Sequence, residues 1–334
     1  MKGRDFAIVA AVVLVGGLAL ADAFRSNGDE PSVEPTQTVP NRRDGPSPQP
    51  DAPEDWPAGR LRGTLVFTDV DDCRIRVIGL GGGRERPAGN LVGFCRLWAA
   101  PIGQRVAYDT GGMRGSPGDS FAIVDLRRAG VEHASVIDFA GNVLWSPDVQ
   151  RLAWCDLDLN GFELDIGDEQ PRALESCPVG YDPEGRLAFA PGRRLVVAGE
   201  TIVTQDATIA YAHWGVDGSL LVALRNGVVR RFGPDGRTDA VSLGSEDSTD
   251  VDPLNVDPSP DNCGLLVQAP GRTELVDMGC FAGRELSFIA FDAAWSHDGQ
   301  WIAVAATDQI VFHQVVGGDD TIVWPAHARE LDWR

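Results

Sequence analysis

Short apolar runs separated by turn-forming residues dominate the chain after about residue 60. Towards the C-terminus such runs cover residues 291–295, 300–306, 310–315 and 321–324, with Asp-Gly and Gly-Gly pairs between them. Because these residues adopt turn dihedral angles at low energetic cost, the pattern is typical of β-hairpins. No segment beyond residue 60 shows a convincing helical period over ten or more residues. The pattern therefore predicts an all-β fold.

One combination recurs along the chain: an aromatic residue, a polar turn and then an apolar strand. The clearest copies are Trp145–Asp148 (Trp-Ser-Pro-Asp) before residues 150–154, and Trp295–Gly299 (Trp-Ser-His-Asp-Gly) before residues 300–304. The first residue of each copy, called the anchor below, stands at Trp98, Trp145, Tyr181, Trp214, Pro258, Trp295 and Trp333. Successive anchors are 47, 36, 33, 44, 37 and 38 residues apart. A period of about 40 residues with four short strands per unit is typical of a β-propeller.

The two ends of the repeat region complement each other. Residues 328–333 form an inner strand without the rest of its blade, whereas residues 61–97 hold about one blade without its inner strand. Joining them predicts seven four-stranded blades, the last closed by both termini, because a terminal blade would otherwise expose unpaired strand edges. Six blades are the alternative, because the units that begin at Tyr181 and Trp214 are short. The aromatic anchors are expected to pack between adjacent sheets.

The first 60 residues differ in composition from the repeats. A short basic segment, residues 1–5, precedes an apolar run within residues 6–24. This order is typical of a signal anchor, so we expect a transmembrane helix there, with a cytoplasmic N-terminus and an extracytoplasmic propeller at residues 61–334. The alternative is a signal peptide cleaved near Ala23, which would make the protein secreted. Residues 25–60 contain eight of the 22 prolines and predict a disordered linker.

The six cysteines fall into three local pairs. Two pairs are 22 residues apart at nearly the same blade positions, and the third is 17 residues apart within one blade. This placement predicts three disulfides, typical of a protein exported to an oxidising space, between Cys73 and Cys95, Cys155 and Cys177, and Cys263 and Cys280. Six buried free thiols are the alternative. The spacing of the cysteines and histidines does not fit a zinc site.

The formal net charge of −20 narrows the range of partners. It argues against nucleic acid and against a propeller lying flat on anionic lipid. It suits a soluble, monomeric propeller outside the cell, or a cationic partner.

The sequence contains no established catalytic motif. There is no Gly-x-Ser-x-Gly, His-Glu-x-x-His or phosphate-binding loop, and the five histidines are scattered singly, at His133, His213, His297, His313 and His327. His297 takes the proline place of a Ser-Pro-Asp turn, so we expect a solvated turn residue. Carboxylates around a propeller channel cannot be assigned from the sequence. We therefore expect no catalytic residues and no cofactor.

One segment has part of a calcium-loop pattern. Asp156, Asp158 and Asn160 alternate and Gly161 follows, as in the first half of such a loop, but Gly167 stands where the final glutamate belongs. The alternative is an ordinary hairpin turn. The acidic run 246–252 is expected to be a solvated loop.

The Trp-Ser-Pro-Asp-(Gly) turns resemble the WD40-like, or TolB-like (PD40-type), propeller repeat found in many bacterial envelope proteins. The resemblance covers residues 61–334, although the Trp-Asp and Gly-His pairs of true WD40 repeats are missing and TolB carries a different N-terminal domain. It implies a protein-binding platform and brings no catalytic residues. We therefore expect a membrane-tethered extracytoplasmic propeller that binds a protein or envelope polymer. The alternative is an extracytoplasmic hydrolase or lyase with carboxylates at the channel mouth.

Overall fold

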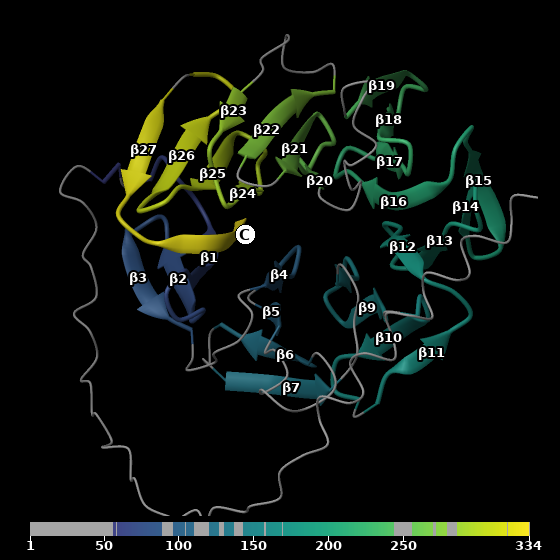
Figure 1. The fold of residues 1–334 in the computed structure, drawn as a ribbon, viewed down its shortest axis with the longest axis horizontal. Coiled ribbons are helices and arrows are strands. Elements are labelled where there is room, and N and C mark those ends of the chain that lie inside the picture. Colours follow the sequence, from purple (N-terminus) through teal and green to yellow (C-terminus); the bar gives the residue numbers. More distant parts are fainter. Residues whose placement is uncertain are drawn as a thin grey trace, which may run out of the picture. The chain divides into compact units, whose positions relative to one another are not determined.

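The computed structural model describes residues 56–333, apart from gaps at 58, 89–95, 104, 110–119, 127–129, 137–142, 157, 169, 244–255, 270–271, 279–285 and 319. The described residues form 28 β-strands in seven four-stranded antiparallel sheets. The sheets follow one another around a centre, with one strand of each sheet facing inwards (Figure 1). This is a seven-bladed β-propeller, as the repeat predicted.

The blades are numbered here from the one that contains both ends of the described chain. Blade 1 is β28, β1, β2 and β3 (Ala328–Trp333, Thr64–Asp69, Ile75–Gly79, Arg84–Pro87). Blade 2 is β4–β7 (Leu97–Ala99, Arg105–Asp109, Ser120–Asp125, Gly130–Val136), and blade 3 is β8–β11 (Leu144–Trp145, Arg151–Cys155, Gly161–Asp165, Arg172–Leu174). Blade 4 is β12–β15 (Pro178–Tyr181, Leu187–Phe189, Arg194–Val197, Glu200–Thr204), and blade 5 is β16–β19 (Ile209–Trp214, Leu220–Leu224, Val228–Phe232, Thr238–Ser242). Blade 6 is β20–β23 (Val256–Pro258, Gly264–Ala269, Arg272–Asp277, Leu286–Phe288), and blade 7 is β24–β27 (Asp292–Trp295, Trp301–Ala305, Ile310–Gln314, Thr321–Trp324).

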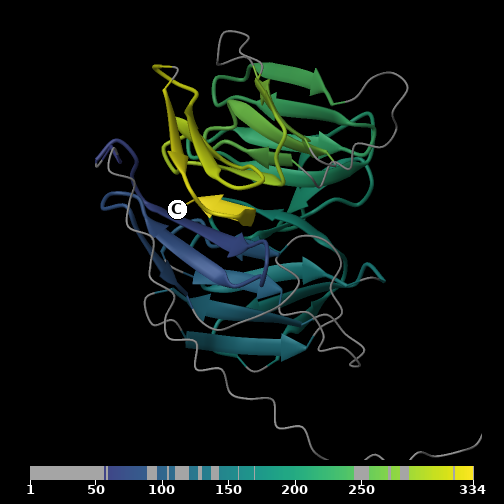
Figure 2. The same cartoon turned by 60° about the vertical axis from the view of Figure 1, so that its left-hand side comes forward.

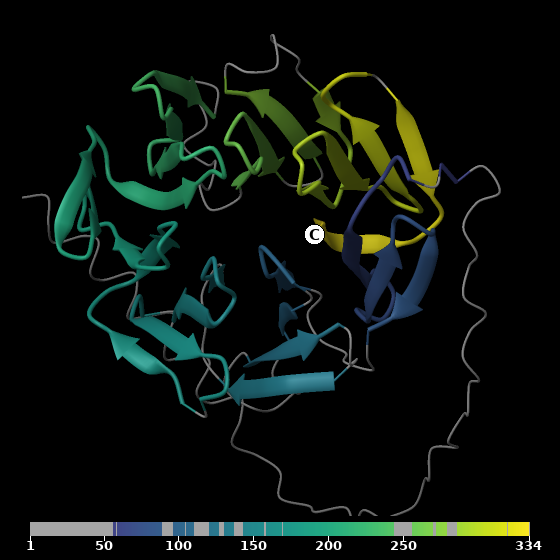
Figure 3. The same cartoon turned by 180° about the vertical axis from the view of Figure 1, so that it is seen from behind.

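The ring closes by pairing the two ends of the repeat region. β28 runs antiparallel to β1, with Leu65 opposite Trp333 and Val66 opposite Asp332. The two strands lie side by side in the front view and from behind (Figures 1 and 3). Closure by both ends is therefore confirmed. The six-bladed alternative is wrong, because the short units at Tyr181 and Trp214 each build a complete sheet of their own.

The turn after each inner strand, called the first turn below, explains the Ser-x-Asp motif of the repeat. In blade 7 the Ser296 hydroxyl accepts a hydrogen bond from the Trp301 N–H (2.9 Å) and donates one to Asp298 Oδ1 (2.7 Å). Serines at the same place in blades 3 and 6, Ser146 and Ser259, make the same two bonds. The hydroxyl thus replaces the ladder partner that the backbone loses where the chain reverses.

Blade 5 has glycine at the place of this serine for a steric reason. A Cβ atom at Gly215 would lie 2.7 Å from Ser219 Oγ, which itself donates to Asp217 Oδ1 (2.5 Å). The serine and the aspartate of the motif are therefore still paired, but the serine stands at the end of the turn, directly before β17.

The core consists of apolar layers between neighbouring blades. The oblique view shows successive sheets stacked against one another (Figure 2). The indole of Trp145 packs on a cluster that joins Ala107 of blade 2 to Leu152 of blade 3, and Trp295 packs with Leu266 of blade 6. The expectation that aromatic anchors pack between sheets is confirmed.

The predicted basic segment, membrane helix and most of the linker, within residues 1–55, lie outside the described residues. In the part of the chain that is described, no helix has the length and apolar character needed to span a bilayer.

Candidate functional site: the central channel

The inner strands enclose a cavity of about 840 Å³ at the centre of the ring. Residues of the inner strands of all seven blades line it, together with residues of the first turns of blades 2–7. It has a polar and an apolar part: Trp98, Trp145, Trp214 and Tyr211 contribute aromatic surface, and several carboxylates contribute charge. The channel is therefore neither filled nor purely apolar.

Acidic side chains predominate among the charged groups of this cavity. The lining carboxylates are Asp182, Asp257, Asp292, Glu330 and Asp332, against a single lining arginine, Arg96, within the described residues. Sequence reasoning missed this cluster, although a signal was present. Two of these acids stand directly before an anchor (Asp257, Asp332) and two stand three residues before one (Asp292, Glu330). Side chains two residues apart on a strand point to the same face. The positions one and three residues before an anchor therefore place all four acids on equivalent faces of their inner strands.

Three of these carboxylates bridge neighbouring blades through backbone N–H groups. Glu330 Oε2 accepts from the Leu97 N–H (2.9 Å), and Asp332 Oδ2 accepts from the Ala99 N–H (2.7 Å), so β28 is joined to β4. Asp292 Oδ2 accepts in the same way from the Leu331 N–H (2.7 Å), which joins β24 to β28. The innermost strand of a blade has one edge without a ladder partner, and these bonds satisfy its donors.

Anchor indoles satisfy carbonyl groups of the same edges. Trp145 Nε1 donates to the Trp98 carbonyl (2.8 Å), and Trp295 Nε1 donates to the Asp257 carbonyl (3.1 Å). In each case the acceptor lies on the inner strand of the preceding blade. A tryptophan anchor therefore contributes a hydrogen bond in addition to its buried apolar area, whereas a phenylalanine would contribute the apolar area alone.

Burial and like charge raise the pKa values of two of the channel acids. Burial raises the pKa of Glu330 to about 7, against the favourable effect of its bond from Leu97 and of the Arg96 charge. Burial raises the pKa of Asp292 well above its usual range, and the nearby charge of Glu330 raises it further. Two neighbouring carboxyls with raised pKa values are unusual outside functional sites, although structural networks also produce them.

One rim of the cavity is formed by the first turns, which expose apolar side chains. Val216 is 78% exposed and Ile102 is 54% exposed. Pro183 is also exposed, and so is His297, which confirms the expected solvated turn residue. These four side chains line the mouth of the cavity and are called the rim below.

Hydrogen bonds between blades hold the rim in place. The Val216 N–H donates to the Pro260 carbonyl in the next first turn (2.7 Å). Arg151 Nη2 donates to the Gly185 carbonyl (2.6 Å), which ties blade 3 to the first turn of blade 4. The first turns of blades 4 and 5, which carry Pro183 and Val216, are therefore tied to neighbouring blades, and the first turn of blade 7, which carries His297, is fixed by its own Ser296 and Asp298.

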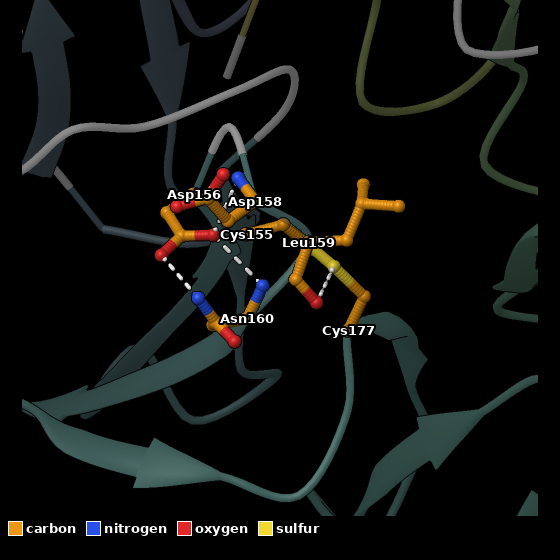
Figure 4. The surroundings of a disulfide bond; sticks show 6 residues. All are labelled: Cys155, Asp156, Asp158, Leu159, Asn160 and Cys177. Atoms are coloured by element: carbon orange, nitrogen blue, oxygen red, sulfur yellow. Dashed lines mark hydrogen bonds between the residues drawn. A yellow bond between two sulfur atoms is a disulfide. The ribbon is translucent and has the colours of Figure 1, made fainter.

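The segment with the calcium-loop pattern forms the hairpin turn between β9 and β10. Asp156 Oδ1 accepts from the N–H groups of Asp158 (2.9 Å) and Asn160 (2.8 Å), and Asp156 Oδ2 accepts from Asn160 Nδ2 (2.8 Å). Figure 4 shows this carboxylate turned towards Asn160. These bonds, the Asn160 amide first, hold the pKa of Asp156 below its usual value.

The third acid near this turn, Glu163, is directed elsewhere. Glu163 is buried on the next strand, where it accepts from Tyr181 Oη (2.9 Å) and pairs with Arg151 and Arg172. Over the described residues, no three His, Cys, Asp or Glu side chains come together as metal ligands. The geometry of the segment is that of the hairpin alternative. The acidic run 246–252 lies outside the described residues.

The disulfide between Cys155 and Cys177 is present, as predicted, with Cα atoms 5.4 Å apart (Figure 4). It links the end of β9 to the residue before β12, so it ties blade 3 to blade 4. Cys73 and Cys263 are also disulfide-bonded. Cys95 and Cys280, their predicted partners, lie outside the described residues.

Comparison with known proteins adds a likeness in fold. No protein-family model and no curated protein sequence matches the chain. Among solved structures, the β-propeller domain of Cps50 (Swd1) from Myceliophteria thermophila is similar, with 13% identity and a TM-score of 0.44 over 71% of this chain and 88% of that domain. This is a likeness in fold only, so the resemblance to TolB-like repeats rests on the turn motif alone.

Proposed function

We propose that this chain is a membrane-tethered extracytoplasmic propeller that binds a protein or a cell-envelope polymer at the rim of its channel and catalyses no reaction. The observation that carries the proposal is the exposure of Ile102 and Val216 on one rim, at 54% and 78%. Exposed apolar side chains on turns around the mouth of one cavity favour a contact surface, because a partner that covers the mouth would remove them from water.

The rigidity of the rim supports a binding role. The first turns are fixed by the bonds of Ser146, Ser259 and Ser296 and by the bond between Val216 and Pro260. A surface that is already ordered loses little conformational entropy when it binds, so less of the contact energy is offset.

The channel acids also fit a binding platform. Glu330, Asp332 and Asp292 are engaged with backbone N–H groups of neighbouring blades, so much of their hydrogen-bonding capacity already serves the ring. Export is supported by the bonded state of Cys155 and Cys177, because disulfides persist in oxidising compartments. The basic and apolar residues within 1–24 support the tether.

Site-specific photocrosslinking in intact cells tests the proposal. A photoreactive amino acid at position 216 or 102 is expected to give a discrete adduct with a partner. The same amino acid at position 202 or 323, on the outermost strands, should give none, although Ile202 and Val323 are similarly exposed, at 48% and 43%. Equal labelling at all four positions, or labelling only at the outer strands, would refute a binding site at the rim.

A second candidate function is an extracytoplasmic hydrolase or lyase that acts through the channel carboxylates. The observation that favours it is the raised pKa of Glu330 beside Asp292 in one cavity, since a carboxyl that holds its proton near neutral pH can act as a general acid. The test is to incubate the purified protein with envelope polysaccharides and peptides between pH 5 and 8. Product formation that disappears in Glu330→Gln would support this function, and no product from any polymer would favour the binding platform.

A further inference from the structure

The closing strand β28 is held in the ring without a covalent link to its own blade. Its residues 328–333 come at the end of the chain, whereas the next strand of the same sheet, β1, begins at Thr64. Any loosening of the ring therefore has its simplest route through β28, because every other inner strand continues into its own blade through a first turn.

Both seams that flank β28 are bridged by carboxylates. On the blade 7 side, Asp292 accepts from the Leu331 N–H at 2.7 Å. On the blade 2 side, Glu330 accepts from the Leu97 N–H at 2.9 Å, and Asp332 accepts from Ala99. The contacts that position the closing strand against its neighbours thus depend on groups that titrate.

Asp292 and Glu330 differ in how many donors they face. Asp292 accepts from the N–H groups of Ala293 and Leu331 and from the side-chain amide of Gln268, so donors surround both of its oxygens. Glu330 accepts one bond, at Oε2, from the described residues. Its Oε1 can therefore carry a proton while the bridge to Leu97 stays in place.

The charges around this pair are mixed, with acids in excess. Arg96, which precedes β4, and Arg329 on β28 favour the ionised form of Glu330, whereas Asp109 at the end of β5 disfavours it. Asp292 faces Glu330 itself and Asp257 of β20. The remaining titratable groups near these strands are Asp69 on β1, Asp332 on β28, and His213 and His297 of the channel lining.

We propose that closure of the ring responds to pH through Glu330: β28 docks firmly while Glu330 holds a proton, and loosens from blades 7 and 2 when loss of that proton leaves a charged carboxylate buried at the seam beside Asp292. Because the pKa of Glu330 is about 7 when β28 is docked and 4.5 when it is free, the open population of β28 rises from about pH 4.5 and levels off above about pH 8. The proposal is independent of what the rim binds.

The size of the effect follows from the proton balance. When β28 is displaced, Glu330 returns to an ordinary pKa of 4.5, so opening releases up to one proton between about pH 4.5 and 7 and progressively less above pH 7. Raising the pH from 6 to 8 through a pKa of about 7 then increases the open population of β28 about tenfold.

Hydrogen–deuterium exchange of the full-length protein, corrected for the intrinsic pH dependence of exchange, tests this. The protection of residues 328–333 is expected to fall about tenfold from pH 6 to pH 8, while β17 in blade 5, which is buried throughout, keeps its protection. Glu330→Gln, which mimics the protonated acid, should retain the high protection at both pH values. The matched control Glu200→Gln, on the exposed strand β15, should behave like the wild type.

Two results would overturn the proposal. One is an unchanged protection of β28 in the wild type between pH 6 and 8, and the other is a fall of the same size in Glu330→Gln. Should Glu330→Gln fail to fold, the carboxyl ¹³C shift of Glu330 in the wild type decides: titration near pH 7 supports the proposal, and a midpoint near the ordinary value of 4.5 contradicts it.

Discussion

The serine of the first turn offers the sharpest test of how the repeat motif works. Ser296 is 3% exposed, accepts from the Trp301 N–H at 2.9 Å and donates to Asp298 Oδ1 at 2.7 Å. Ser296→Ala removes both bonds with little change in volume. Asp298 keeps its bond from the Gln300 N–H, so the turn retains one of its own contacts.

The expected loss of stability comes mainly from the Trp301 N–H, which loses its acceptor. A buried N–H left without a partner costs about 1–3 kcal/mol, and a neutral hydrogen bond contributes about 1 kcal/mol net. We therefore expect Ser296→Ala to lower the free energy of unfolding by about 2 kcal/mol. The same change at Ser146 or Ser259, which make equivalent bonds, should cost a similar amount.

Urea denaturation measures the loss of stability, and hydrogen exchange at the Trp301 amide locates it. The control is Ser287→Ala on β23, where the serine is exposed and the change should stay within about 0.5 kcal/mol. If Ser296→Ala and Ser287→Ala were equally stable, or if the Trp301 amide exchanged no faster, the motif would not act through this hydroxyl.

Three further substitutions test the packing between blades, the disulfide and the titration of the channel. Gly180→Ala should destabilise the fold by more than about 2 kcal/mol in thermal unfolding, because the new Cβ would lie 2.3 Å from a backbone oxygen of the adjacent inner strand. The control is Gly81→Ala, whose Cβ would meet nothing within 4 Å and which should leave the stability unchanged. Removing the disulfide by Cys155→Ala with Cys177→Ala should cost about 3 kcal/mol in urea denaturation, since it frees a loop of 22 residues in the unfolded chain. As the control, the difference between wild type and variant should vanish when both are measured under reducing conditions. Because burial raises the pKa of Glu330 from 4.5 to about 7, its proton stabilises the native state fully below about pH 4.5, and this contribution of up to about 3 kcal/mol is lost as the pH rises through 7. Glu330→Gln should flatten that part of the stability profile, and an unchanged slope between pH 5.5 and 8 would contradict the assignment.

The repeat could be predicted from the sequence because its turns and strands are specified by residues close together in the chain. In blade 7 the predicted strands 291–295, 300–306, 310–315 and 321–324 agree with β24–β27 to within one or two residues. Turn residues and alternating apolar positions specify hairpins over a few residues, and the anchors repeat those hairpins at a regular spacing. The Cys155–Cys177 pairing could be predicted for the same reason, since Cys155 ends the second strand of blade 3 and Cys177 directly precedes the first strand of blade 4.

The cluster of carboxylates in the channel could not be predicted in the same way. Asp292 and Glu330 are 38 residues apart in the chain and belong to different blades, so their proximity depends on how two inner strands meet at the centre. Their position three residues before an anchor indicates that they share a face, but it does not show that this face is buried or that N–H groups of the next blade point towards it. In the segment with the calcium-loop pattern, Asp156, Asp158 and Asn160 have the spacing of metal ligands in the sequence. In the structure, the carboxylate of Asp156 accepts hydrogen bonds from its own turn.

The sequence by itself determined the class of fold and the way the ring closes, and it favoured seven blades over six, because hairpin formation and strand alternation depend on near neighbours and recur along the chain. Tertiary structure alone decided which carboxylates face one another, which rim side chains are exposed, and which of the titratable groups hold β28 in place. These properties depend on desolvation and on distances between blades, and both are set only when the inner strands of all seven blades meet around the channel.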